Sequence, residues 1–172
     1  MENEIKNKIS SEMEEEINKH RKALKEKIKK YLTPDKPVDV LIMKANLICE
    51  YYVNHILILK EKASAQEINE LNFFVKINKA FNQQDDEQKK LRDRLVKLNN
   101  LRNRVGHELE YVLSEYDVDC LGYLTGKEYV LEKYNYEDKK QLLYITLLYI
   151  VIDVALFVTG LVTDEKLIKK HS

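Results

Sequence analysis

Arginine and histidine side chains concentrated in one stretch of this chain have the types and spacing of a site that handles phosphate. Four of the five arginines fall within thirteen positions, namely Arg92, Arg94, Arg102 and Arg104. Arginine presents a planar, always-charged fork that binds phosphate through paired hydrogen bonds, and histidine gains or loses a proton near neutral pH. Arg102, Asn103 and His107 therefore combine a phosphate holder, a polar group and a proton-transfer group.

The residues around this motif predict a long helix from Asp86 to Tyr116. Its apolar stripe consists of Leu91, Leu95, Leu98, Val105, Leu109, Val112 and Leu113. At 100° per residue, Arg102 falls within this stripe, and His107 lies about 140° away on a face shared with Asn99 and Asn103. A charge on a buried face is costly unless it is paired, so Arg102 requires either a carboxylate partner or a seam that an anion can enter.

Two further residues are expected to support the motif. Glu50 lies in an apolar helix and either faces solvent or points inward to pair with Arg102. Gly106 weakens a helix by roughly 1 kcal/mol relative to alanine, but it lets another backbone or a substrate approach beside His107. Arg104 is expected to add a substrate contact. Arg92 and Arg94 are either peripheral phosphate contacts or solvated side chains.

Composition limits the class of function. Lys plus Arg and Asp plus Glu both number 29, so no overall field attracts nucleic acid, and any attraction must come from a local patch. Cys49 and Cys120 have no metal or redox spacing, and no signal peptide opens the chain, which favours a reducing cytoplasm. No cofactor is expected, and no metal, since no carboxylate or histidine cluster has ligand spacing.

The remaining pattern predicts an all-α, up-and-down helical bundle. Residues 1–32 form a charged N-terminal helix, which is either a solvated arm or a partner-binding helix, and residues 33–172 form the bundle. Prolines between Thr33 and Pro37 separate the two. Further helices are expected from Pro37 to Lys60, from a capping box at Ser64 to Phe81, and from Gln141 to Gly160, with a short tail helix after Thr163.

Two segments of the bundle allow more than one interpretation. Between Asp117 and Tyr136 the helical period fails, and glycines at 122 and 126 favour a small hairpin or an ordered loop. The helix from Gln141 to Gly160 is long and apolar enough to span a bilayer. Asp153 near its middle favours a helix buried within the domain and its dimer mate instead.

The motif and its helical setting resemble the R-x4-6-H motif of HEPN domains. The resemblance extends from Val38 to Val162 and rests on Arg102, Asn103 and His107, on the apolar helix carrying Glu50, and on the order of the helices. It implies a metal-independent RNA endonuclease of the toxin or anti-phage type, with one site built by two copies of the motif in a homodimer. Arg102, Asn103 and His107 would be catalytic, RNA the substrate, and an antitoxin or defence-system protein a further partner.

One departure from the family and two alternatives accompany this hypothesis. Toxins of the family that pair with a nucleotidyltransferase antitoxin carry tyrosine two residues after the histidine, whereas this chain has Leu109 there and its tyrosine at Tyr111. Some HEPN proteins have lost activity, so a non-catalytic helical module that binds a nucleotide or a protein partner is the main alternative. A membrane-anchored protein is a third.

Overall fold

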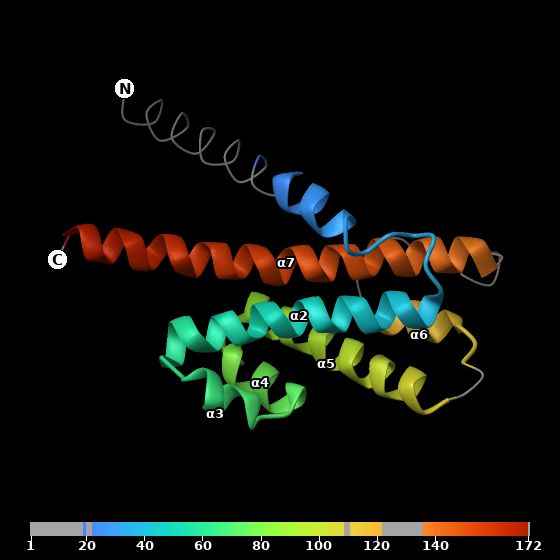
Figure 1. Ribbon diagram of the computed structural model, residues 1–172, viewed down its shortest axis with the longest axis horizontal. Helices are drawn as coiled ribbons and strands as arrows, with labels where there is room; N and C mark the ends of the chain where they lie inside the picture. The colour runs from blue at the N-terminus through green and yellow to red at the C-terminus, as the bar shows by residue number, and fades with distance from the viewer. Residues whose placement is uncertain (1–18, 20–21, 109–110, 122–135, 172) are drawn as a thin grey trace.

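Two long helices that run side by side in the same direction form the spine of the protein (Figure 1). The structure is a computed structural model that describes residues 19, 22–108, 111–121 and 136–171. Helix α2 (Val38–Glu61) lies alongside α7 (Tyr136–His171), and the other elements pack around this pair (Figure 1). The described residues form helices and no strands, so the prediction of an all-α bundle is confirmed.

Helix α2 is the central helix of the bundle. It contacts α3, α4, α5 and α7, and its fully buried side chains include Leu41, Ile42 and Ile56. The helix begins after Pro37 and ends at Glu61, where Lys62 adopts a left-handed conformation with φ 51°. Burial of Cys49 on this helix raises the pKa of its thiol, because the thiolate would lose its hydration.

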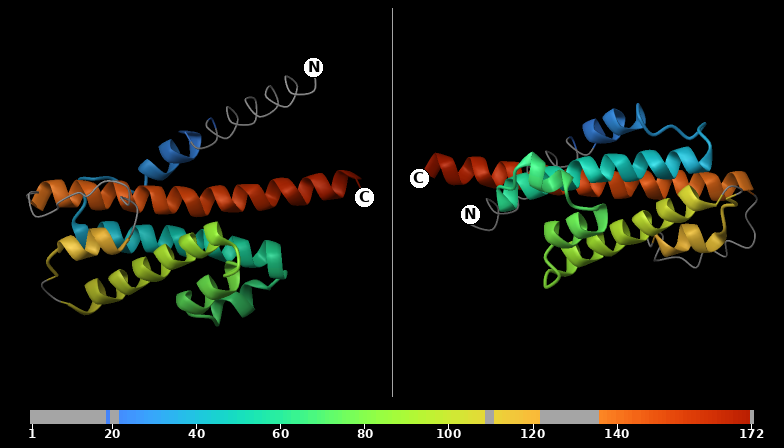
Figure 2. Two further views of the ribbon diagram at one scale, coloured as in Figure 1. Left: turned by 180° about the vertical axis from the view of Figure 1, so that it is seen from behind. Right: turned by 60° about the horizontal axis from the view of Figure 1, so that its bottom comes forward.

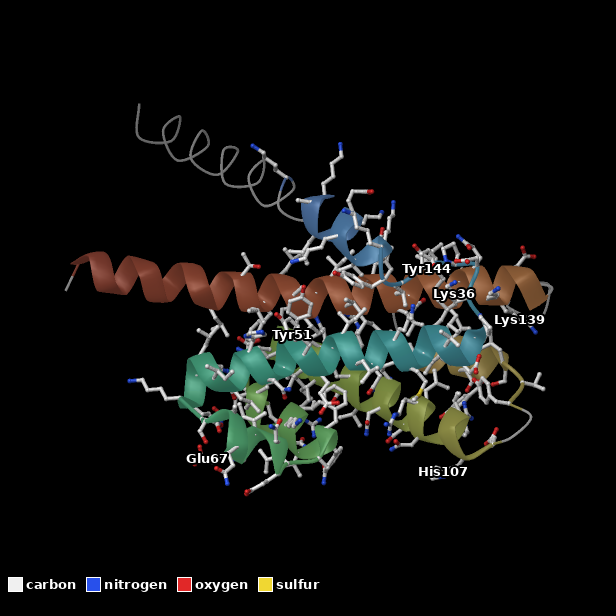
Figure 3. The ribbon with its side chains drawn as sticks, in the orientation of Figure 1. Lys36, Tyr51, Glu67, His107, Lys139 and Tyr144 are labelled. Atoms are coloured by element: carbon white, nitrogen blue, oxygen red, sulfur yellow. The ribbon has the colours of Figure 1, made fainter. Side chains whose placement is uncertain are left out.

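The predicted helix from Ser64 to Phe81 is instead two short helices, α3 (Ala65–Asn69) and α4 (Phe73–Ala80). The capping box at Ser64 is confirmed, because Ser64 and Glu67 exchange hydrogen bonds. The Ser64 backbone amide and hydroxyl lower the pKa of Glu67, which is labelled in Figure 3. Asn72 interrupts the helix, because its side chain accepts a hydrogen bond from the backbone of Val75 and starts α4.

The motif helix is shorter than predicted. Helix α5 (Asp86–His107) stops at His107, and a separate short helix, α6 (Glu115–Cys120), follows. The Asp117 side chain accepts hydrogen bonds from the amide and hydroxyl of Ser114, so Ser114 starts a new helix at this point. Because α6 is helical, the prediction of a hairpin or loop from position 117 is wrong as far as Cys120. Residues 122–135, which carry the rest of that prediction, lie outside the described part of the chain.

Helix α7 runs without a break for 36 residues, past the expected end at Gly160. A helical glycine costs only about 1 kcal/mol relative to alanine, which is too little to stop a helix with good formers on both sides. Within α7, Asp138–Leu161 is long and apolar enough to cross a membrane, and 56% of its most apolar window is buried in the fold. The core helix of a soluble protein meets the same criteria.

The described part of the N-terminal segment is helical over residues 22–29 and lies against the spine (Figure 2). Ile28 and Leu32 are buried in the common core, and the Lys25 ammonium lies 5.7 Å from the centre of the Tyr149 ring on α7. The turn that follows carries the two prolines, as the sequence predicts.

Candidate functional site

Three of the four clustered arginines are held by carboxylates of the chain itself. Arg92 donates to Asp93 at 2.7 Å and to the side chain of Asn78 on α4 at 2.6 and 2.9 Å. Arg94 lies 3.6 Å from Asp153 on α7. These contacts tie the first half of α5 to its neighbours. They also give Asp153, in the most apolar helix, an opposite charge.

Arg104 is held by Asp117 of α6, whose side chain is only 1% exposed. The Arg104 guanidinium also lies 5.7 Å from the centre of the Tyr111 ring, and the Tyr111 hydroxyl donates to Asp117 at 2.8 Å. Arg92, Arg94 and Arg104, expected as substrate contacts, therefore each have a structural partner. The sequence did not reveal this cluster, although the Ser114-to-Asp117 spacing is a helix-start signal.

Arg102 differs from the other three. No carboxylate pairs with it among the described residues, and its Nη1 donates a hydrogen bond to the adjacent Asn103 Oδ1 at 2.9 Å. The side chain is exposed, contrary to its position in the predicted apolar stripe. Of the two outcomes expected for Arg102, a carboxylate partner or an open seam, the structure places it at the seam.

The reason for this exposure is the extent of α4. Helices α4 and α5 run antiparallel. Asn78 near the end of α4 therefore meets Arg92 of α5, whereas Phe73 at the beginning of α4 lies near Arg102. Helix α5 continues beyond this point with no further turn of α4 to cover it. Burial there shifts to Leu101 and Val105, which are 3% and 9% exposed.

A cavity of about 430 Å³ opens where α4 begins, between α2, α4 and α5. Most of its lining residues are polar. They are Asn46, Glu50, Leu71, Asn72, Phe73, Phe74, Asn99, Arg102 and Asn103. The sequence-predicted residues Glu50, Arg102 and Asn103 thus come together in one cavity.

Glu50 does not form the expected ion pair with Arg102. Its carboxylate accepts a hydrogen bond from the Lys76 ammonium on α4 at 2.6 Å. Lys76 is 4% exposed and requires this partner, since an unpaired charge at that depth would be strongly destabilising. The Glu50 and Lys76 charges cancel, which leaves Arg102 as the uncompensated charge among the described residues of this cavity.

Two buried amides in the cavity lining were not singled out from the sequence as site residues. Asn46 is 3% exposed and Asn99 8% exposed. The Asn46 amide nitrogen is buried and donates to no described acceptor. Buried polar groups are satisfied in the great majority of cases, so this donor marks the cavity as chemically incomplete. In the sequence pattern, Asn99 shares a polar face of its helix with Asn103 and His107, so the pattern gave no sign of its burial.

His107 is the last residue of α5, and its side chain points away from the bundle (Figure 3). It is exposed and is not among the residues that line the cavity. Gly106 beside it is also exposed, and a Cβ atom built there would meet nothing within 4 Å. The space beside His107 is therefore open in a single chain. Leu109, which departs from the toxin pattern, lies outside the described residues.

No group of three or more metal-ligating side chains occurs among the residues that the structure describes. No protein-family model, no curated protein and no solved structure matches the chain.

Proposed function

We propose that this protein is a metal-independent RNA endonuclease whose phosphate-binding residue is Arg102. The supporting observation is the contrast among the clustered arginines. Arg92, Arg94 and Arg104 have carboxylate partners, whereas Arg102 has none among the described residues and borders a cavity. An arginine fork at a cavity fits the phosphodiester of a nucleic acid strand. The resemblance of Arg102, Asn103 and His107 to the HEPN motif supports the same function.

The proposed reaction uses the RNA 2′-hydroxyl as nucleophile. This oxygen forms a bond to phosphorus, the bond from phosphorus to the 5′-oxygen breaks, and the products are a 2′,3′-cyclic phosphate and a 5′-hydroxyl. One proton leaves the 2′-hydroxyl and another reaches the 5′-oxygen, and His107 serves as general base or acid. Arg102 stabilises the charge that develops on the non-bridging oxygens, and Asn103 orients a reacting group.

A non-catalytic nucleotide-binding module is the second candidate. The observation that favours it is the place of His107, which is not among the residues lining the cavity that Arg102 borders. Under this alternative the cavity binds its ligand through Arg102, and no proton transfer takes place. The two candidates share a ligand class and differ in turnover.

An RNA cleavage assay in EDTA distinguishes the two candidates. We expect the wild-type protein to cleave RNA and to leave cyclic phosphate ends, which mass spectrometry of the products identifies. His107→Ala and Arg102→Ala should each lower the rate by roughly 10² or more, as is typical for loss of an acid–base or charge-stabilising group. Both side chains are exposed, so both variants should keep their stability within about 0.5 kcal/mol.

Lys89→Ala is the matched control, because Lys89 is an exposed cation on the same helix and lies outside the cavity. It should cleave RNA at the wild-type rate. Cleavage by both motif variants at that rate would rule out the proposed site. RNA binding without cleavage in the wild-type protein would favour the second candidate. Activity lost in EDTA and restored by magnesium would indicate a metal mechanism instead.

A further inference from the structure

We propose that the cavity between α2, α4 and α5 binds one base of the RNA strand while Arg102 at its edge holds the adjoining phosphate. The proposal rests on the proposed function for the identity of the ligand as RNA. It adds that the protein recognises the base beside that phosphate. A phosphate contact alone carries no sequence information, whereas hydrogen bonds to base edges do.

The size and charge of the cavity fit a nucleotide. Its volume of about 430 Å³ is in the range of small-molecule pockets and accommodates a base with its sugar. The Glu50 carboxylate is neutralised by Lys76, so Arg102 gives the described lining one net positive charge. One positive charge matches one phosphodiester, and the neutral remainder of the lining matches an uncharged base.

Asn46 is the strongest indication that a polar ligand belongs in this cavity. Its amide nitrogen is buried and has no described acceptor, although buried donors are nearly always satisfied. Asn99 contributes a second buried amide to the same lining. The Watson–Crick edge of every base offers acceptors and donors side by side, and asparagine amides are well suited to pair with them.

Phe74 supplies an aromatic surface at the same cavity. It is 47% exposed although it is a large apolar side chain, and it lies in the first turn of α4. Stacking on aromatic side chains is the usual way in which proteins hold an unpaired RNA base. The cavity therefore offers amides that can form hydrogen bonds with the edge of a base and an aromatic ring that can stack on its face.

Calorimetry with the full chain tests the proposal without relying on cleavage. The probes are ribose 5-phosphate and the four nucleoside 5′-monophosphates. We expect at least one nucleotide to bind roughly tenfold or more tightly than ribose 5-phosphate, because stacking and base hydrogen bonds are added to the phosphate contact. Arg102→Gln should weaken the binding of all five probes, since each carries the phosphate.

Asn46→Leu separates a binding role from a structural one. It should abolish the preference for nucleotide over ribose 5-phosphate while the melting temperature stays the same or rises, because the variant removes an unsatisfied buried donor. Phe74→Leu should reduce the same preference roughly tenfold. Asn54→Leu is the matched control, because Asn54 lies two turns later on α2, also has a buried side-chain atom without a described partner, and does not line the cavity. It should leave binding unchanged.

The failure of this proposal and the failure of the proposed function are distinguishable. Equal binding of ribose 5-phosphate and all four nucleotides would overturn the base pocket, even in a protein that cleaves RNA. Base-dependent binding that depends on Asn46, in a protein that cleaves no RNA, would support the pocket and overturn the endonuclease. Wild-type base preference in Asn46→Leu would also overturn the pocket, because the residue that indicates it would then have no part in binding.

Discussion

Arginine side chains on one helix take different roles here according to what lies opposite them. Arg94 faces Asp153 and Arg104 faces Asp117, so each is a link between helices. Arg102 faces a cavity in which the acid, Glu50, is already paired with Lys76. A carboxylate opposite an arginine competes directly with phosphate. The residue available for an anion is therefore identified by its neighbours rather than by its own type.

At the same scale, Gly106 allows a test of whether anything approaches the motif. A methyl group at this position meets nothing within 4 Å in a single chain, and alanine is the better helix former. We expect Gly106→Ala to raise the free energy of unfolding by about 0.5–1 kcal/mol, measured by urea denaturation. Under the proposed function, RNA cleavage should fall nonetheless, because a substrate or a second chain would then approach beside His107.

Gly160→Ala provides the control for that experiment. Gly160 is also helical and exposed, and a Cβ atom there also meets nothing within 4 Å, but it lies on α7 away from the motif. This variant should gain similar stability with unchanged cleavage. If Gly106→Ala cleaves RNA as well as Gly160→Ala does, nothing approaches closely at Gly106, and its supporting role is excluded.

At the scale of elements, the sequence predicted the helices well and their ends unevenly. Local signals, such as the prolines before α2 and the capping box at Ser64, were sufficient to predict where those helices begin. The break at Asn72 and the new start at Ser114 were missed, since a polar cap inside an apolar pattern competes with the pattern itself. The opposite error was the predicted helix end at Gly160, because a long apolar helix tolerates one glycine and α7 continues past it.

The junction between α5 and α6 depends on Asp117. This buried carboxylate accepts hydrogen bonds from Tyr111 and from the amide and hydroxyl of Ser114, and it pairs with Arg104. We expect Asp117→Ala to lower the free energy of unfolding by about 3 kcal/mol, since several charge-assisted hydrogen bonds are lost together. Chemical denaturation measures the change.

Arg104→Ala is the companion variant at this junction. Its side chain is 39% exposed, and its removal leaves the other three hydrogen bonds to Asp117 in place, so it should cost clearly less than Asp117→Ala. A loss of stability for Arg104→Ala that equals or exceeds that of Asp117→Ala would contradict the central role of the carboxylate. It would place the main contribution on the arginine and Tyr111 instead.

At the scale of the whole molecule, the sequence predicted only part of how the candidate site residues are arranged. It identified Glu50, Arg102 and Asn103, which line one cavity. It could not predict that Lys76 would take the carboxylate, because that pairing depends on how α4 packs along α2. The buried amides of Asn46 and Asn99 were missed for the same reason. The position of this cavity depends on where the helices begin and end relative to one another. A helical wheel shows the faces of a single helix and contains no information on its ends.

Under the proposed function, His107 must reach a phosphate that Arg102 holds. The two residues diverge by about 140° on an ideal helix, and His107 points away from the bundle. Large apolar side chains nearby, Val112 and Tyr116, are 74% and 71% exposed. An exposed apolar surface beside the motif favours a two-fold homodimer in which His107 of one chain approaches Arg102 of the other.

Mixing two inactive variants tests that arrangement. Refolding Arg102→Ala together with His107→Ala gives about half heterodimers, each with one intact arginine–histidine pair across the interface, so roughly a quarter of wild-type activity should return. Mixing Arg102→Ala with the double variant is the control and should restore no activity, because no dimer then has both groups.

Sedimentation must show the wild-type protein as a dimer, and its activity per chain should fall on dilution below the dissociation constant. A fully active monomer would exclude the shared site. A dimer whose mixed variants stay inactive would show instead that each chain uses its own pair, and His107 would then have to reach the phosphate by a movement of the end of α5.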